Sequence, residues 1–434
     1  MKRQSSRRRM AGFTLIEMMI SMVVGLVVIS AVVAVQKAFE SQRRTSVSGN
    51  DLDNAGAYAL AQIDSLVRSA GSGFSQGYQQ SYGCELYANN GGTALLPAGG
   101  AFASPFDNVL GSAGTWNSLG GAVRVAPLVI LPKITDTALL NQGNGQSDVL
   151  MVMGGTGAEA NVQTLFSAPA ASGTVTLQSG AGFHPNDLIM LIDAAQASGP
   201  ATCQINQVGT ITALANGAQL NLSGTMVANP TTATATSPYG MSIDASAVPI
   251  GNSVGNYPTF QLIGVGANSQ LTSYDMLQLI NAAPVAIGDS VMELHALYLT
   301  ANGVGTSPCG AACIGVDPSK TAAYNPSTLL NGTTAATAAL ATIKAVRIGL
   351  ILKSPLMEKL QGPSGALTHV GPPTLTLFSD VPDATGTPGN LTYTRTLDPT
   401  GLCSATAPLP QCELDFRYRT MEITIPLRNP MMIS

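Results

Sequence analysis

Charged residues are scarce in this chain: Asp, Glu, Lys and Arg make up only 10% of its 434 residues. Long solvent-exposed helices need a polar face rich in charged side chains, so a chain with so few charges is not expected to be mainly helical. The chain instead contains 46 glycines and 26 prolines, a composition typical of short strands joined by turns. Its length is enough for one large or two modest domains.

Histidines and known catalytic motifs are also nearly absent. No H-E-x-x-H or EF-hand pattern occurs. A G-x-S-x-G match at 251–255 lies between Pro249 and Pro258, whereas a nucleophile elbow needs a strand before it and a helix after it. His295 lies in an apolar strand candidate and is interpreted as a sheet residue. We therefore expect no enzyme activity, no catalytic residue, no metal and no cofactor. The three histidines are widely separated: His184, His295 and His369.

The apolar run 13–35 carries a single charge, Glu17. At ~1.5 Å per residue, a helix of this length covers the ~30 Å of bilayer hydrocarbon. An acid inside such a helix costs free energy and calls for a counter-charge. The segment before Gly12 contains no acid and should stay cytoplasmic because it is basic. Its cations are Lys2, Arg3, Arg7, Arg8 and Arg9.

The cleavage signal stands before the apolar run, whereas an ordinary secretory signal is cleaved after it. The string Gly12-Phe13-Thr14-Leu15-Ile16-Glu17 closely resembles the prepilin motif of type IV pilins and pseudopilins. This resemblance implies that a prepilin peptidase cuts after Gly12, methylates the new N-terminal Phe13 and leaves the apolar helix in place. It also implies that Glu17 pairs with the N-terminal ammonium of a neighbouring subunit. A plain signal anchor with a stray acid is the alternative.

All six cysteines follow the apolar run, on its oxidising side, where structural disulfides are the expected use. Closeness in sequence favours Cys309 with Cys313 and Cys403 with Cys412, which leaves Cys84 for Cys203. Free buried thiols and metal or redox chemistry are the alternatives. The C-x-x-x-C spacing at 309–313 matches neither a redox motif nor a zinc knuckle.

The region after the membrane segment continues as an amphipathic helix over 36–72, because apolar residues recur there at three- and four-residue steps. Gly71-Ser72-Gly73 ends it. Residues 73–434 are predicted to form a β-rich domain, with two long surface loops at 88–121 and 303–342. The strand candidates are 123–131, 148–153, 174–177, 188–193, 204–212, 219–222, 259–263, 271–280, 291–300, 346–353, 374–378, 391–396 and 417–427.

Nucleic acid is not an expected partner. Loss of the leader, residues 1–12, takes the net charge from −4 to −9, and an acidic chain lacks broad affinity for phosphates. Arg417-Tyr418-Arg419 has a pattern that could clamp single-stranded DNA. Strand alternation places both arginines on one face, and a solvated strand face is the simpler interpretation.

Further segments resemble the PilW branch of minor pilins: MVVGL at 22–26, VRSAG at 67–71, VRIGL at 346–350 and TIPLRN at 424–429. The resemblance implies an α+β pilin fold, with a long N-terminal helix packed on an elaborated antiparallel sheet. It implies an inner-membrane subunit with a cytoplasmic N-terminus and a periplasmic bulk, which primes type IV pilus assembly and then enters the fibre at the cell surface.

The partners implied are other minor and major pilins, the prepilin peptidase and the inner-membrane assembly platform. A position at the pilus tip, with effects on adhesion or twitching motility, is also implied. The alternatives are a type II secretion pseudopilin and a tip adhesin or DNA-uptake pilin.

Overall fold

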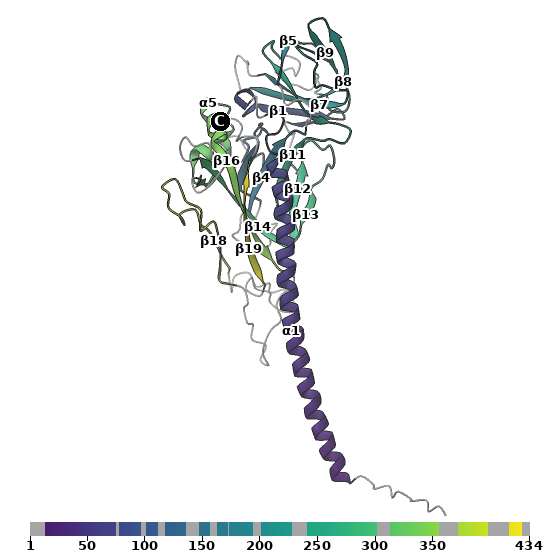
Figure 1. The fold of residues 1–434 in the computed structure, drawn as a ribbon, viewed down its shortest axis with the longest axis vertical. Coiled ribbons are helices and arrows are strands. Elements are labelled where there is room, and N and C mark those ends of the chain that lie inside the picture. The colour runs from purple at the N-terminus through teal and green to yellow at the C-terminus, as the bar shows by residue number, and fades with distance from the viewer. Residues whose placement is uncertain are drawn as a thin grey trace, which may run out of the picture.

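The computed structural model describes residues 14–74, 78–96, 101–111, 118–135, 147–156, 163–171, 173–193, 201–227, 241–301, 313–355, 372–397 and 416–427. Figure 1 shows a long helix, α1, that carries a large β-rich body at its C-terminal end. The α+β class is therefore confirmed. Gly12 and Phe13 lie outside the described residues.

The helix α1 spans Leu15–Arg68 without a break at Gly49. Its first half is exposed, and from Leu52 onward one side is buried, as the three- and four-residue spacing predicts. The turn that follows α1 is hydrogen-bonded to the end of β4 (Ser147–Gly154). The N–H of Gly71 donates to the Met153 carbonyl at 2.7 Å. Gly71 has φ +76°, a conformation that favours glycine at a helix end.

The body contains two antiparallel sheets that pack on each other, and β4, β11 and β3 contact β14. The helix α1 contacts β13 of one sheet and β16 and β19 of the other (Figure 1). The first sheet has the order β13 (Val285–Gly288), β12 (Gln270–Asp275), β11 (Thr259–Gly266), β4 and β3 (Leu128–Thr135). The second has the order β15 (Cys313–Val316), β14 (Val291–Ala301), β16 (Ile343–Lys353) and β19 (Tyr418–Pro426).

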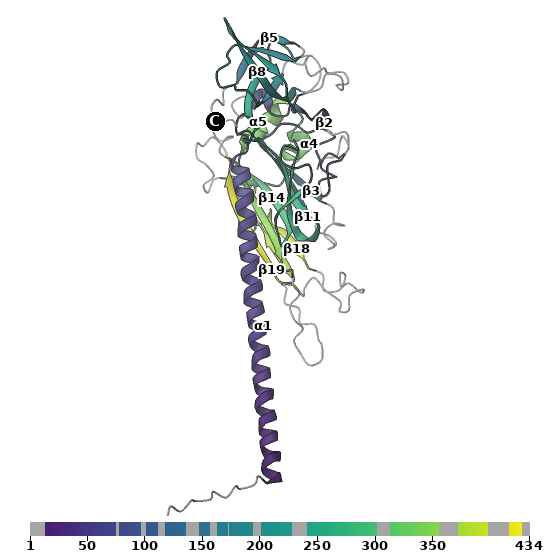
Figure 2. The same cartoon turned by 90° about the vertical axis from the view of Figure 1, so that its right-hand side faces the viewer.

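A third sheet lies at the end of the molecule remote from the start of α1 (Figures 1 and 2). Six of its strands close into a barrel, because β8 pairs with both β7 and β9. The barrel encloses its own apolar core, which includes Phe166, Leu191 and Leu220. The sheet order is β2 (Thr93–Leu96), β1 (Glu85–Asn90), β8 (Thr202–Leu214), β7 (Asp187–Asp193), β10 (Ser246–Asn252), β5 (Thr164–Ala171), β6 (Thr174–Leu177) and β9 (Gly217–Leu222).

The barrel is an insertion in the first sheet. It lies within residues 155–258, and the flanking strands β4 and β11 are direct neighbours, with Gly154 opposite Thr259. The chain therefore leaves the body and returns to it at one place.

The remaining elements are short. The hairpin of β17 (Thr374–Leu377) and β18 (Tyr393–Thr396) contacts the second sheet through β19. Short helices lie between the strands: α2 (Tyr78–Ser81), η2 (Ala267–Ser269), η3 (Ala322–Tyr324), α4 (Pro326–Leu329) and α5 (Thr334–Thr342).

Several expectations need correction. The β-rich region forms several sheets and a barrel instead of one elaborated sheet, and β1 pairs with β8 in parallel. The predicted loop 88–121 contains β2 and buries Phe102 and Phe106. The predicted loop 303–342 contains β15, α4 and α5. Both stretches were missed because their apolar residues are spaced irregularly among small ones.

Candidate functional site

The first turn of α1 places Glu17 directly after the predicted cleavage point. Thr14 caps the helix, and its Oγ1 accepts a hydrogen bond from the Glu17 N–H at 3.3 Å. An acid in the first turn also faces the positive end of the helix dipole. The Glu17 side chain is exposed in the single chain, so it is available to a partner.

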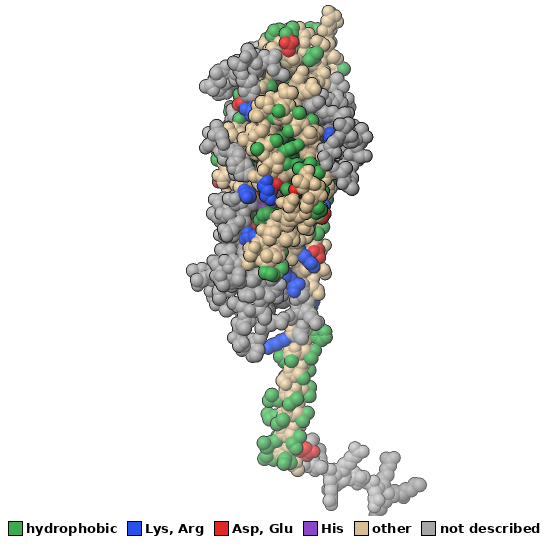
Figure 3. Space-filling model, turned by 90° about the vertical axis from the view of Figure 1, so that its left-hand side faces the viewer, with side chains coloured by type: hydrophobic (Ala, Val, Ile, Leu, Met, Phe, Trp, Pro, Cys, Tyr) green, Lys and Arg blue, Asp and Glu red, His purple; other side chains and the backbone are tan. Residues whose placement is uncertain are grey.

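The segment Leu15–Lys37 is long and apolar enough to cross a membrane, and none of it is buried against the body. We call the helix α1 the stalk. Figure 3 shows hydrophobic side chains along this part of it. Two hydroxyls within it are satisfied locally, as a bilayer requires: Ser21 donates to the Met18 carbonyl and Ser30 to the Val27 carbonyl. The segment is thus consistent with a membrane anchor.

The second half of α1 packs closely against β16 and β19 of the body, and we call this contact the stalk–body seam. Gly56 faces Met421 and Leu352, and a Cβ at this position would overlap both side chains. One turn earlier, Arg419 Nε lies 3.5 Å from Asp53 Oδ1. The second half of α1 is therefore packed closely on β16 and β19.

A disulfide joins the start of the body to the barrel. Cys84, just before β1, is bonded to Cys203 on β8, across 119 residues of sequence. The predicted pairing of Cys84 with Cys203, which was reached by elimination, is therefore confirmed. Cys313 is also disulfide-bonded. The other predicted cysteines, Cys309, Cys403 and Cys412, lie outside the described residues.

The structure does not assemble a hydrolase triad from the G-x-S-x-G match. The strand β10 ends at Asn252, and β11 follows at Thr259 with no helix between them. The Ser253 hydroxyl donates to the Asn186 carbonyl and accepts from Gln207. His184 is exposed beside Asp187, and His369 lies outside the described residues. Within the described part of the chain, no group of three or more His, Cys, Asp or Glu residues could hold a metal ion.

His295 instead belongs to a buried charge cluster, which joins three sheets. We define this cluster as Asp148 on β4, Glu293 and His295 on β14, and Tyr393 and Arg395 on β18. His295 Nδ1 lies 3.6 Å from Asp148 Oδ2, and Nε2 lies 3.2 Å from Glu293 Oε2. Arg395 donates to Glu293, and so does the Tyr393 hydroxyl at 2.8 Å. Two acids thus balance two cations.

These partners control the protonation of the cluster. Burial alone would lower the pKa of His295, but hydrogen bonds and charge from Asp148 and Glu293 raise that pKa to about 9. Burial would raise the pKa of Glu293, yet His295, Arg395 and Tyr393 together lower it. Glu293 is 0% exposed and His295 5%, so at neutral pH both are charged inside the protein.

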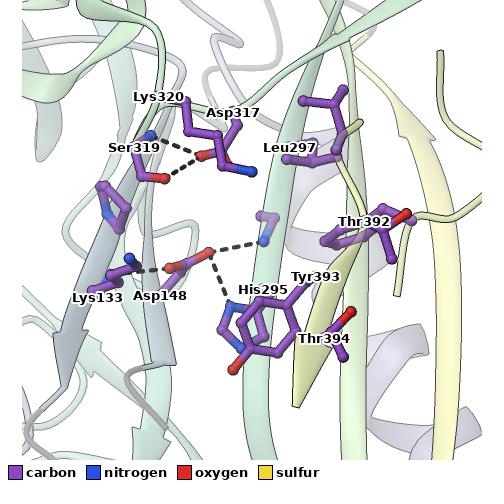
Figure 4. Close-up of a pocket in the computed structure, with 14 residues that line it drawn as sticks. Lys133, Asp148, His295, Leu297, Asp317, Ser319, Lys320, Thr392, Tyr393 and Thr394 are labelled. Atoms are coloured by element: carbon purple, nitrogen blue, oxygen red, sulfur yellow. Dashed lines mark hydrogen bonds and ion pairs between the residues drawn. The ribbon is translucent and has the colours of Figure 1, made fainter. Parts of the chain in front are cut away.

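A cavity of about 140 Å³ adjoins the cluster at the junction of the three sheets. Figure 4 shows Asp317 and Lys320 on one side of it and Asp148 and His295 on another, with the Tyr393 ring stacked on the His295 ring. The cavity is a candidate small-molecule site, because it combines polar groups with a shifted pKa.

The sequence analysis treated His295 only as a sheet residue and did not single out Asp148 or Glu293. The signal was present in the strand patterns. Glu293 and His295 lie two residues apart in an apolar strand, and Asp148 begins another, so all three were placed to be buried. A buried charge without a partner is too costly, and three such positions imply that they meet.

Comparison with known proteins identifies only the N-terminal segment. Residues 7–33 match the family model described as the prokaryotic N-terminal methylation motif. No curated protein and no solved structure matches the chain. The motif implies processing by the prepilin peptidase and pilus-assembly partners in general. The matched residues span the predicted cleavage point and the exposed apolar half of α1, and they support a type IV pilin-like protein.

Proposed function

We propose that this chain is a minor pilin of the PilW type, which takes part in priming type IV pilus assembly. One observation carries the proposal: a prepilin methylation motif leads directly into a helix whose first half is apolar and wholly exposed. Such a helix needs a membrane before assembly and other helices after it. The role is structural, without enzyme activity.

In this function Gly12 and Phe13 serve processing, and Glu17 serves subunit registration. Cleavage after Gly12 creates a positive amine at Phe13. Glu17 lies four residues on and is exposed, so it can neutralise the amine of a neighbouring subunit in a low-dielectric environment. The amine and the acid make docking between subunits specific.

Residues 13–35 would hold the protein in the inner membrane, with its N-terminus in the cytoplasm and its body in the periplasm. The protein would then enter the pilus fibre. Its large body favours a place at the pilus tip, where the distal barrel meets no subunit above it. Adhesion or motility would then depend on this subunit.

A DNA-uptake role is disfavoured by charge. Residues 134–319, which include the whole barrel, contain no Lys or Arg. Binding of the phosphate backbone depends on such residues. A type II secretion pseudopilin shares the same leader and remains the second candidate.

The test is mass spectrometry of the N-terminus of the membrane-extracted protein, with and without the prepilin peptidase. The expected product begins with methylated Phe13. Retention of Met1 in the presence of active peptidase, or cleavage after the apolar segment, would contradict the proposal. A deletion strain then separates the two machineries: loss of surface pili with normal protein secretion supports a minor pilin, and the reverse supports a pseudopilin.

A further inference from the structure

The rim of the cavity contains a residue in an unusual backbone conformation. Lys133 lies at an irregularity in β3, where the pairing with β4 shifts between Leu131 and Thr135. Its φ is +55°, a value that side-chain-bearing residues rarely adopt. The Lys133 N–H donates to the buried Asp148 carboxylate at 2.9 Å. Asp148 therefore fixes the Lys133 backbone at the rim of the cavity, where the Lys133 side chain is exposed.

Among the described residues, the charges around the cavity leave one cation, Lys133, without an ion-pair partner. Asp148 faces His295 at 3.6 Å and also accepts from the Ala296 N–H at 3.0 Å. Asp317 accepts from Ser319 and lies 3.4 Å from Lys320 Nζ. Lys133 forms no ion pair with any described residue. The described lining thus carries a net charge of about +1 when His295 is protonated.

The rest of the lining combines hydroxyl and apolar groups. Thr392 and Thr394 come from the β18 side, and Leu297, Phe378 and Leu391 supply apolar surface. The volume of about 140 Å³ is close to that of an engineered cavity, about 150 Å³, that holds benzene. A ligand of that size with one negative charge and a short apolar part would match the site.

We propose that this cavity binds a small organic carboxylate, which Lys133 anchors through its ammonium group. The carboxylate would accept charge-assisted hydrogen bonds from Lys133 and hydrogen bonds from the threonine hydroxyls, and the apolar part would cover Leu297 and Leu391. The source is either a free small acid or the side chain of an acidic residue on a neighbouring protein. This site goes beyond the proposed assembly role, which is argued from the N-terminal motif and the first half of α1.

The experiment uses the full chain in detergent and measures binding of butyrate by calorimetry and by saturation-transfer NMR. Butylamine and 1-butanol are matched probes with the same carbon chain. We expect butyrate to bind and the other two to fail. Equal binding of all three probes, or no binding of any carboxylate probe, would overturn the proposal without the need for a variant.

A substitution then tests the anchor. Lys133→Asn removes the charge but retains a residue type that tolerates positive φ. We expect it to weaken butyrate binding roughly tenfold or more, the effect of losing one charge-assisted hydrogen bond. Lys344→Gln removes a cation that does not line the cavity and should leave binding unchanged. Unaltered affinity in Lys133→Asn, with an unchanged circular dichroism spectrum, would also overturn the proposal.

Peptides distinguish the two sources of the carboxylate. A short peptide with blocked ends and one central Glu is compared with the same peptide containing Gln. Binding of the Glu peptide, in competition with butyrate, assigns the site to a neighbouring protein. Binding of butyrate alone assigns it to a free acid.

Discussion

Asp148 and His295 lie on strands of two different sheets, and 3.6 Å separates Asp148 Oδ2 from His295 Nδ1. Glu293 lies at the other ring nitrogen, and Tyr393 and Arg395 bring the β17–β18 hairpin to Glu293. Removal of one partner from a buried ion pair costs about 3–5 kcal/mol, because the remaining charge stays buried. The cluster therefore joins the two sheets and this hairpin through buried charges.

Stability should fall as the pH rises from neutral to alkaline. The pKa of His295 is raised from 6.5 to about 9 by Asp148 and Glu293, so its contribution is complete below about pH 6.5 and is lost as the pH passes about 9. The loss should be on the order of 3 kcal/mol. Urea unfolding of the full chain in detergent between pH 6 and 10 measures it.

Two histidine variants test whether His295 causes the change of unfolding free energy with pH, which we call the slope. His295→Gln should remove most of the slope between pH 6 and 10, whereas His184→Gln should retain it, because the His184 side chain is 59% exposed. A flat profile in the unmodified protein would show that His295 does not stay protonated in the folded state.

Glu17→Gln should block incorporation into pili without unfolding the protein. Among the described residues, the hydrogen bonds that involve the Glu17 side chain stay within the first turn of α1, so the body loses no contact when the charge is removed. Immunoblots of sheared pili and of membranes measure the two pools. Normal amounts of the variant in the fibre would contradict a role of Glu17 in docking.

Gly56→Leu should destabilise the stalk–body seam by about 1–3 kcal/mol, because the larger side chain overlaps Met421 and Leu352. Gly49→Leu is the matched control in the same helix, since nothing lies within 4 Å of a Cβ there. That change should be neutral or stabilising by up to about 1 kcal/mol, from helix propensity alone. Thermal unfolding of both variants in detergent compares them, and equal effects would show that the seam is not closely packed.

Loss of the Cys84–Cys203 disulfide should lower the free energy of unfolding by about 2–5 kcal/mol, since the bond closes a long loop. The double variant Cys84→Ser, Cys203→Ser avoids an unpaired thiol. Limited proteolysis should then cleave first near β1, where the barrel is held to the body. Wild-type protease resistance would show that the parallel pairing of β1 with β8 is sufficient.

The long apolar helix and most strands followed from local patterns. An uninterrupted apolar run, and apolar residues at helical or alternating spacing, act over distances of a few residues and can be recognised without the fold. Val291–Ala301 and Ile343–Lys353 were predicted within a few residues of their observed bounds for this reason.

The barrel and the charge cluster could not be predicted in the same way. Strands β5 and β10 contain Pro169 and Pro249, which argue against strands when only local sequence is considered. Closure of the barrel depends on the long strand β8 pairing with different neighbours at its two ends. The cluster joins residues more than 240 positions apart, Asp148 and Arg395, and such distances leave no local periodicity.

The barrel leaves the first sheet at Gly154 and returns to it at Thr259. A two-residue turn could join these opposed positions into an ordinary hairpin and keep the order of the first sheet, but β1 would lose its partner β8 and Cys84 its partner Cys203. The same point could accept a different domain of any length, because the ends of an insert need only be close together. Exchange of the barrel would thus change the end of the molecule remote from the start of α1 and leave the N-terminal methylation motif and α1 as they are.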